Sequence, residues 1–150
     1  MPLVRLSPED ELAYLKELYG EEKAVLLDRV THSFGILQTR SSMLLSLIAL
    51  CLTISGFSGP KIAESGAFAA LAISLGAFGS IVAAVLLVCG PLQLRWVTTW
   101  KDDNFDTSIL NLLQTRNQRT RRYHKAAVCL VFGLSMFVLG LIAYTFPFIF

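Results

Sequence analysis

The sequence predicts an all-α integral membrane protein, in which three transmembrane helices are joined to cytoplasmic amphipathic helices. The chain of 150 residues is 54% hydrophobic and 16% charged, whereas a typical soluble domain is about 45–50% apolar and about 25% charged. Nearly all of the charge lies in residues 1–40 and 95–125. Segments 66–94 and 126–150 contain no charged residue, and each exceeds the roughly 20 residues that cross a bilayer as a helix.

A third apolar segment, 41–57, is at the short end of the spanning range. Arg40 precedes it and can extend its usable length, because a long basic side chain can reach from the apolar layer to the interface. The predicted organisation is therefore a helical N-terminal region, 1–40, and a transmembrane domain, 41–150. A secretory signal peptide is not indicated, since the first apolar run follows an acidic stretch. Core helices of a soluble protein would need a polar face, which the second and third segments lack.

The distribution of positive charge predicts the topology. Every Lys and Arg except Lys61 lies in residues 1–40 or 95–125. Because positive residues that flank transmembrane helices are retained in the cytoplasm, both of these segments should be cytoplasmic. We expect a bacterial inner-membrane protein whose C-terminus lies outside.

A basic cluster directly precedes the third apolar segment. We interpret it as a retention signal that also contacts anionic lipid headgroups, each such contact being worth about 1 kcal/mol. These contacts are expected from Arg116, Arg119, Arg121, Arg122 and Lys125. A nucleotide or nucleic-acid site is the alternative, but the sequence has no glycine-rich phosphate loop, and Tyr123 is the cluster's one aromatic residue. No nucleic-acid partner is therefore expected.

The N-terminal region reads as two helices. Ser7 is a suitable N-cap, Pro8 suits the first helical position, and Gly20 marks the end. The first helix should carry an apolar stripe of Leu12, Leu15, Leu18 and Tyr19. The second helix should carry an apolar stripe that consists of Leu26, Val30, Phe34 and Leu37. We expect this second helix to continue into the first transmembrane segment.

The segment between the second and third spans also contains a helical pattern. Asn104 or Asp106 can cap a helix that places Ile109, Leu112, Leu113 and Arg116 at helical spacing. This helix should pack against the N-terminal helices on the same side of the membrane. Its basic residues can pair with the acidic N-terminal helix, although exposed pairs contribute only about 0–1 kcal/mol each.

Small residues recur on the transmembrane segments and indicate close helix packing. The second segment carries a ridge, four residues apart, of Ala72, Gly76, Ser80 and Ala84. The third carries Gly133 and Gly140. Small residues let helix backbones approach closely inside a membrane. The ridge is compatible with packing within one chain and with self-association or docking to a larger complex.

The sequence predicts no catalytic residue, cofactor or metal site. Segments 66–94 and 126–150 have no Asp, Glu, Lys, Arg or His, the residues that mark proton relays and ion pathways. His32 and His124 are poorly placed to share a haem, since both precede their membrane segments. The cysteines form no CxxC pattern, and buried inert thiols are expected of Cys51, Cys89 and Cys129.

These observations favour a non-catalytic accessory or scaffold subunit that docks to a larger membrane complex. The alternative is a homo-oligomeric membrane effector or pore, and an enzyme is third. The expected partners are membrane lipids and either other subunits or copies of the chain. The layout is similar, in architecture alone, to that of small bacterial membrane effectors of cyclic-nucleotide-triggered anti-phage systems. The cytoplasmic segments are too short for a separate nucleotide-binding fold.

Overall fold

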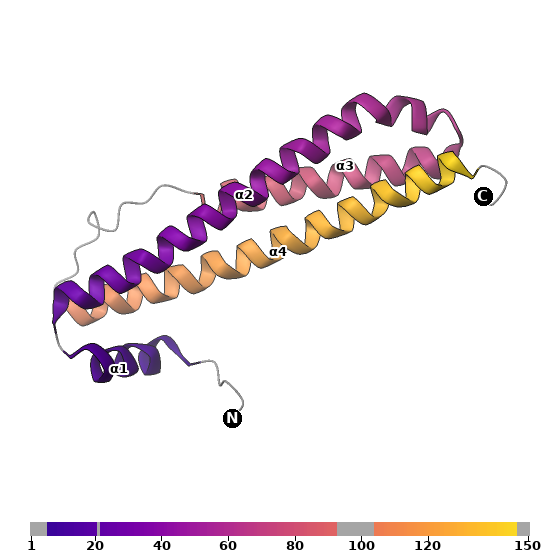
Figure 1. Cartoon of the computed structure of the whole chain (residues 1–150). Coiled ribbons are helices and arrows are strands. Elements are labelled where there is room, and N and C mark those ends of the chain that lie inside the picture. The colour runs from indigo at the N-terminus through magenta and orange to yellow at the C-terminus, as the bar shows by residue number, and fades with distance from the viewer. Residues whose placement is uncertain (1–5, 21, 93–103, 147–150) are drawn as a thin grey trace.

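The computed structural model describes residues 6–20, 22–92 and 104–146, which form four helices (Figure 1). They are α1 (Pro8–Tyr19), α2 (Lys23–Ala63), α3 (Ala67–Val88) and α4 (Phe105–Thr145). Helices α2, α3 and α4 are each long and apolar enough to cross a membrane. The predicted all-helical class, with three helices suited to span a bilayer, is therefore confirmed.

The three long helices run side by side, with α3 antiparallel to α2 and α4 (Figure 1). Helices α2 and α4 have 41 residues each, or about 60 Å at 1.5 Å per residue. The hydrocarbon core of a bilayer is only about 30 Å thick. About half of each helix must therefore project beyond the membrane.

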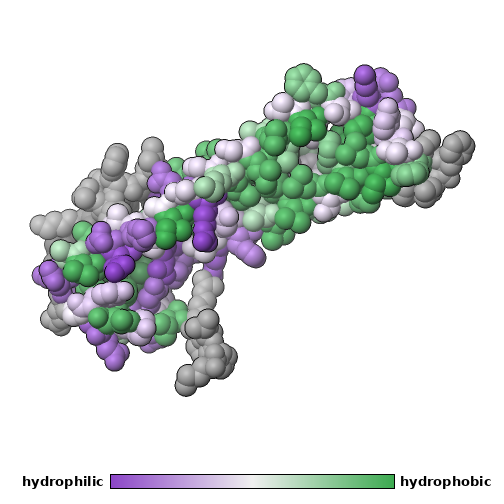
Figure 2. Space-filling view, in the orientation of Figure 1, coloured by the Kyte–Doolittle hydropathy of each residue, from purple (hydrophilic) through white to green (hydrophobic). Residues whose placement is uncertain are grey.

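The molecule divides along its length into two parts of different polarity. Hydrophobic residues cover the part that contains α3, while hydrophilic residues gather around α1 and the beginnings of α2 and α4 (Figure 2). We call residues 41–92 and 126–146 the apolar shaft, and residues 6–40 and 104–125 the polar stalk. A smaller hydrophilic group lies at the far end of the shaft, where Lys61 and Glu64 are exposed.

Local sequence signals set the helix ends of the stalk. The Asp10 amide donates a hydrogen bond of 3.1 Å to the Ser7 hydroxyl, Pro8 occupies the first helical position, and Gly20 follows α1 with a φ of 72°. These three predictions are confirmed. Asn104 rather than Asp106 is the N-cap of α4, since its side-chain oxygen accepts from the Asp106 amide at 3.3 Å.

Helix α4 is longer than the sequence patterns indicated. The predicted helix after residue 104 and the third transmembrane segment form one continuous helix from Phe105 to Thr145. This stretch contains no proline, and its first glycine is Gly133, so nothing in it interrupts the backbone hydrogen bonds. Helix α2 is continuous through the first segment, as predicted, and extends to Ala63 rather than residue 57.

Helix α3 ends before the predicted second segment does. It stops at Val88 and is followed by a turn in which the Leu92 amide donates to the Leu87 carbonyl at 3.1 Å. Pro91 explains the stop, because the residue before a proline is disfavoured in helical conformation. Residues 93–94 and 147–150 of the predicted spans, and 95–103 of the predicted loop, lie outside the described residues.

Three hydrophobic clusters hold the helices together. In the stalk the buried residues are Leu12, Val30, Ile109 and Leu113. At the near end of the shaft, which adjoins the stalk, the buried residues are Ile48, Ala83, Leu87, Ala126 and Leu130. At the far end they are Ile62, Ala69, Ile73 and Ala143. Of the predicted stripe on α1 only Leu12 is buried, whereas Leu18 and Tyr19 are exposed.

Candidate functional site: the polar stalk and its basic cluster

Helices α3 and α4 touch through their backbones at the predicted small-residue positions. A Cβ atom on Gly76 would lie 2.9 Å from the Gly133 carbonyl oxygen, and one on Gly133 would lie 2.8 Å from the Gly76 carbonyl oxygen. Real Cβ atoms essentially never come this close to another heavy atom. The two glycines therefore face each other, and neither site has room for a side chain.

The neighbouring small residues extend the same contact. Ala72 and Ser80 are buried, the Ser80 hydroxyl donates to the Gly76 carbonyl at 3.0 Å, and Ala84 packs against the near core cluster. A Cβ on Gly140 would lie 3.0 Å from Ile73 Cδ1. Thus α4 of the same chain covers the ridge, which leaves little of it open to a second copy.

Gly79 also belongs to this contact, although the sequence patterns did not point to it. Its Cβ would lie 3.2 Å from the Gly133 Cα. Gly79 follows Gly76 by three residues, so it lies beside the four-residue ridge rather than on it. Small residues spaced by three as well as by four positions are the sequence signal that would have identified Gly79.

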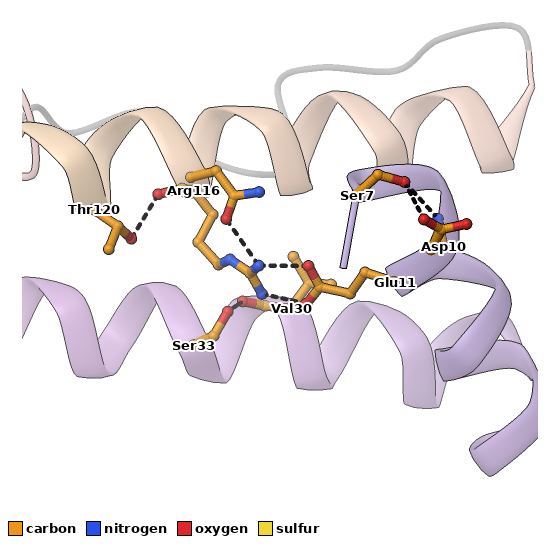
Figure 3. A network of polar contacts seen from close by, with 8 residues as sticks. Ser7, Asp10, Glu11, Val30, Ser33, Arg116 and Thr120 are labelled. Atoms are coloured by element: carbon orange, nitrogen blue, oxygen red, sulfur yellow. Dashed lines mark hydrogen bonds and ion pairs between the residues drawn. The ribbon is translucent and has the colours of Figure 1, made fainter. Parts of the chain in front are cut away.

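Arg116 of the basic cluster binds the N-terminal helix. Its guanidinium donates two hydrogen bonds to the Glu11 carboxylate, at 2.8 Å and 2.6 Å, and a third to the Asn117 side chain at 3.0 Å. Figure 3 shows the guanidinium directed at Glu11 across the gap between α4 and α1. Both side chains of the pair are largely buried, with 21% and 22% exposed. Such bidentate pairs are among the stronger polar contacts in proteins.

A second ion pair attaches the other side of α1. Lys16 Nζ lies 2.6 Å from Asp106 Oδ2, and both side chains are more exposed than those of the first pair. Between the two pairs, Leu12 inserts into the stalk core with 7% of its surface exposed. Within the described residues, α1 is therefore held by one buried side chain, two flanking ion pairs and a cation–π contact, in which the Arg29 guanidinium of α2 lies 5.1 Å from the centre of the Tyr19 ring.

Two further arginines of the cluster are also engaged within the protein. Arg122 donates from Nη1 to the Cys89 carbonyl at 2.6 Å, where α3 ends. A cation at this position satisfies a free carbonyl and interacts favourably with the helix dipole. The Arg119 guanidinium lies 5.4 Å from the centre of the Phe34 ring on α2, a cation–π contact.

Arg121 and Lys125 differ from the other three. Both are exposed, and neither forms a hydrogen bond or ion pair with another described residue. They are four residues apart and so occupy the same side of α4. The basic cluster, which has no internal division in the sequence, thus separates into three structural cations and two that face outward.

The remaining candidates do not assemble into a site within the described part of the chain. His32 and His124 are exposed on α2 and α4. No group of three or more His, Cys, Asp or Glu side chains among the described residues could hold a metal ion. The three cysteines are free, and Cys89 is exposed whereas Cys51 and Cys129 are half-buried.

The stalk offers charged and apolar surface, and the shaft offers apolar surface. No protein-family model matches the chain, and comparison with curated proteins and with solved structures found no match either.

Proposed function

We propose that the chain is a non-catalytic scaffold or accessory subunit of a larger membrane assembly. Its shaft anchors it in the bilayer, and its stalk presents α1 to a partner. One observation carries this proposal: the outward side of α1 exposes two large apolar side chains, Tyr14 and Leu18, at 53% and 51%. Adjacent exposed apolar residues on a water-facing surface are typical of interaction sites.

The helical geometry explains why these two side chains stay exposed. Glu11 and Lys16 bind α4 and flank the buried Leu12, so they fix which side of α1 faces the stalk. Tyr14 and Leu18 are one turn apart and share a side of α1 that does not include the buried Leu12. The ion pairs therefore orient an apolar pair away from the protein, where a partner can cover it.

The polarity of the spanning helices supports a non-catalytic role. Residues 67–88 and 126–145 contain no ionisable Asp, Glu, Lys, Arg or His. The hydroxyls of Ser74, Ser135 and Thr145 donate to carbonyls of their own helices, four residues back. These groups are thus satisfied locally and offer neither a nucleophile with a base nor a polar lining.

The alternative function, a homo-oligomeric pore or effector, has weaker support. Copies packed through the shaft would meet through apolar side chains such as Met43, Phe57 and Phe78, which are all exposed. A conducting pore needs a polar lumen or a gated constriction. The exposed shaft residues provide apolar surface that suits contact with lipid.

We expect the assembly to contain other subunits. When the complex is extracted from its native membrane in a mild detergent and its mass is measured, the chain should co-migrate with unrelated proteins in a fixed ratio. Replacing Tyr14 and Leu18 together with serine should release these proteins, because it removes the apolar contact. The matched control is Ile36→Ser on α2, which removes an exposed apolar side chain elsewhere on the stalk. A species built only from multiples of this chain would contradict the proposal.

The proposed orientation places the stalk in the cytoplasm of a bacterium and the α2–α3 connection outside its inner membrane. Among the described residues, every Lys and Arg except Lys61 lies on the stalk, so this orientation follows from the retention of positive charge in the cytoplasm.

Cysteine labelling tests the orientation. In a variant without the native cysteines, a membrane-impermeant maleimide added to intact cells should modify Glu64→Cys and leave Glu17→Cys unmodified. Both positions are exposed, so both should react after the cells are lysed. Labelling of Glu17→Cys in intact cells would reverse the orientation.

A further inference from the structure

The border between stalk and shaft can be located on all three long helices. Leu44 of α2, Leu92 after α3 and Ala126 of α4 belong to one core cluster or pack against it. Arg122 lies one turn before Ala126 and binds the carbonyl at the end of α3. The long helices therefore leave the apolar shaft at one common level, which is where a membrane surface would lie.

Arg121 and Lys125 lie at this border on the outer side of α4. Their stripe continues at helical spacing into Val128 and Phe132, which are 56% and 48% exposed. The same side of one helix thus passes directly from cations to apolar side chains that face outward. Such a stripe matches the change from phosphate headgroups to acyl chains in a bilayer leaflet.

Internal contacts distinguish the other three arginines of the basic cluster from Arg121 and Lys125. Arg116 is paired with Glu11, Arg119 lies over Phe34, and Arg122 binds the Cys89 carbonyl. Arg121 and Lys125 have no such contact among the described residues. Their side chains are long enough to reach a phosphate group beside the helix, and that contact would neutralise them.

We propose that Arg121 and Lys125 bind the phosphate groups of anionic phospholipids at the stalk-side membrane surface. This narrows the lipid contact expected from the whole basic cluster to its two outward-facing members. The face leads into exposed Val128 and Phe132, which favours a lipid over a soluble anion, because acyl chains cover that apolar surface at the same time. The inference depends on residence in a membrane and is independent of the proposed scaffold function.

The test measures lipid selectivity of the full chain in vesicles of defined composition. The protein is reconstituted in phosphatidylcholine vesicles that contain trace spin-labelled phosphatidylglycerol or spin-labelled phosphatidylcholine. The fraction of motionally restricted label gives the relative association of the two lipids. The wild-type protein should prefer phosphatidylglycerol, and this preference should weaken as salt is added, since exposed charges are screened.

Removal of the two cations should abolish the preference. The double variant Arg121→Gln, Lys125→Gln should lose several-fold in selectivity, at most about fivefold for each cation. The matched control, Glu11→Gln with Arg116→Gln, removes a cation that is engaged within the stalk and should keep the preference. Circular dichroism should show the wild-type helix content in the first variant, while the control, which lacks the pair that attaches α1, should lose at most that helix. Unchanged selectivity in the first variant, or an equal loss in the control, would overturn the proposal.

Discussion

Gly76→Leu is expected to force α3 and α4 apart and to destabilise the bundle by about 3 kcal/mol or more. Even the Cβ atom of an alanine would lie 2.9 Å from the Gly133 carbonyl oxygen, and this oxygen belongs to the backbone of a helix. It cannot move aside as a flexible side chain does. The helices must separate, and the close packing that holds them together in an apolar environment is then lost.

The measurement is reversible unfolding in mixed micelles, followed by circular dichroism as the denaturing detergent is increased. Gly76→Leu should unfold at a lower fraction of this detergent than the wild-type protein does, and Gly76→Ala should lie between them. The matched control is Gly35→Leu on α2, where a Cβ meets nothing within 4 Å. This control should unfold like the wild type or later, because leucine favours helix more than glycine does.

The same variant separates the two interpretations of the small-residue ridge. If the ridge packs α3 against α4 within one chain, Gly76→Leu lowers the stability of the fold. If it serves self-association, the variant keeps its stability and forms a smaller species on a sizing column. Unfolding at the wild-type detergent fraction, together with a smaller species, would therefore contradict the contact between Gly76 and Gly133.

Local signals explain why much of the fold could be predicted. The uncharged segments require only composition and length, and the caps at Ser7 and Asn104 require only neighbouring residues. Of the stripe predicted on α2, Leu26, Val30 and Leu37 are buried and Phe34 is half-buried, because periodic apolar residues on one side of a helix face whatever it packs against. Each of these predictions depends on residues that are close in sequence.

The contacts that divide the basic cluster depend on residues far apart in sequence. Glu11 and Arg116 are separated by 105 positions, and Arg122 and Cys89 by 33. Composition predicts that acidic and basic segments attract, but not which carboxylate binds which arginine. That choice follows from the register in which α1 lies on the stalk, and Leu12 sets this register by filling the gap between α2 and α4.

The exposure of Leu18 and Tyr19 has the same origin. The sequence placed both in one stripe with Leu12, yet α1 has only 12 residues and meets two helices rather than a broad surface. One apolar side chain is enough to fill that gap. The ion pairs beside it then fix the rotation of α1, which leaves Leu15 half-buried and Leu18 exposed, while the Tyr19 ring lies beside Arg29 of α2.

Arg116→Glu should release α1 from the stalk, and Glu11→Arg in the same chain should restore its attachment. The single variant replaces a bidentate ion pair by two carboxylates at the same place. The loss should be about 1–3 kcal/mol, the range for hydrogen bonds to charged groups. A helix of this length is marginal alone in water, so α1 should unfold once it is released.

Amide hydrogen exchange in α1 reports this change directly. Exchange should be roughly 10- to 100-fold faster in Arg116→Glu, because local opening requires that much less free energy. The matched control is Glu17→Arg, which makes a charge reversal of the same size at an exposed position on α1. It should leave the exchange nearly unchanged, since the bidentate pair and Leu12 remain in place.

The charge-swapped double variant distinguishes a specific pair from a general attraction. If the attachment depends on Glu11 and Arg116 facing each other, reversing both restores most of the protection, although the exchanged side chains differ in length. If the double variant exchanges as fast as Arg116→Glu, then the pair does not hold α1, and Leu12, the second ion pair and the contact between Tyr19 and Arg29 must do so. In the first case the direction of Tyr14 and Leu18 also depends on the pair, because the contact that attaches α1 also fixes its outward side. The scaffold function then requires Arg116, although this residue touches no partner.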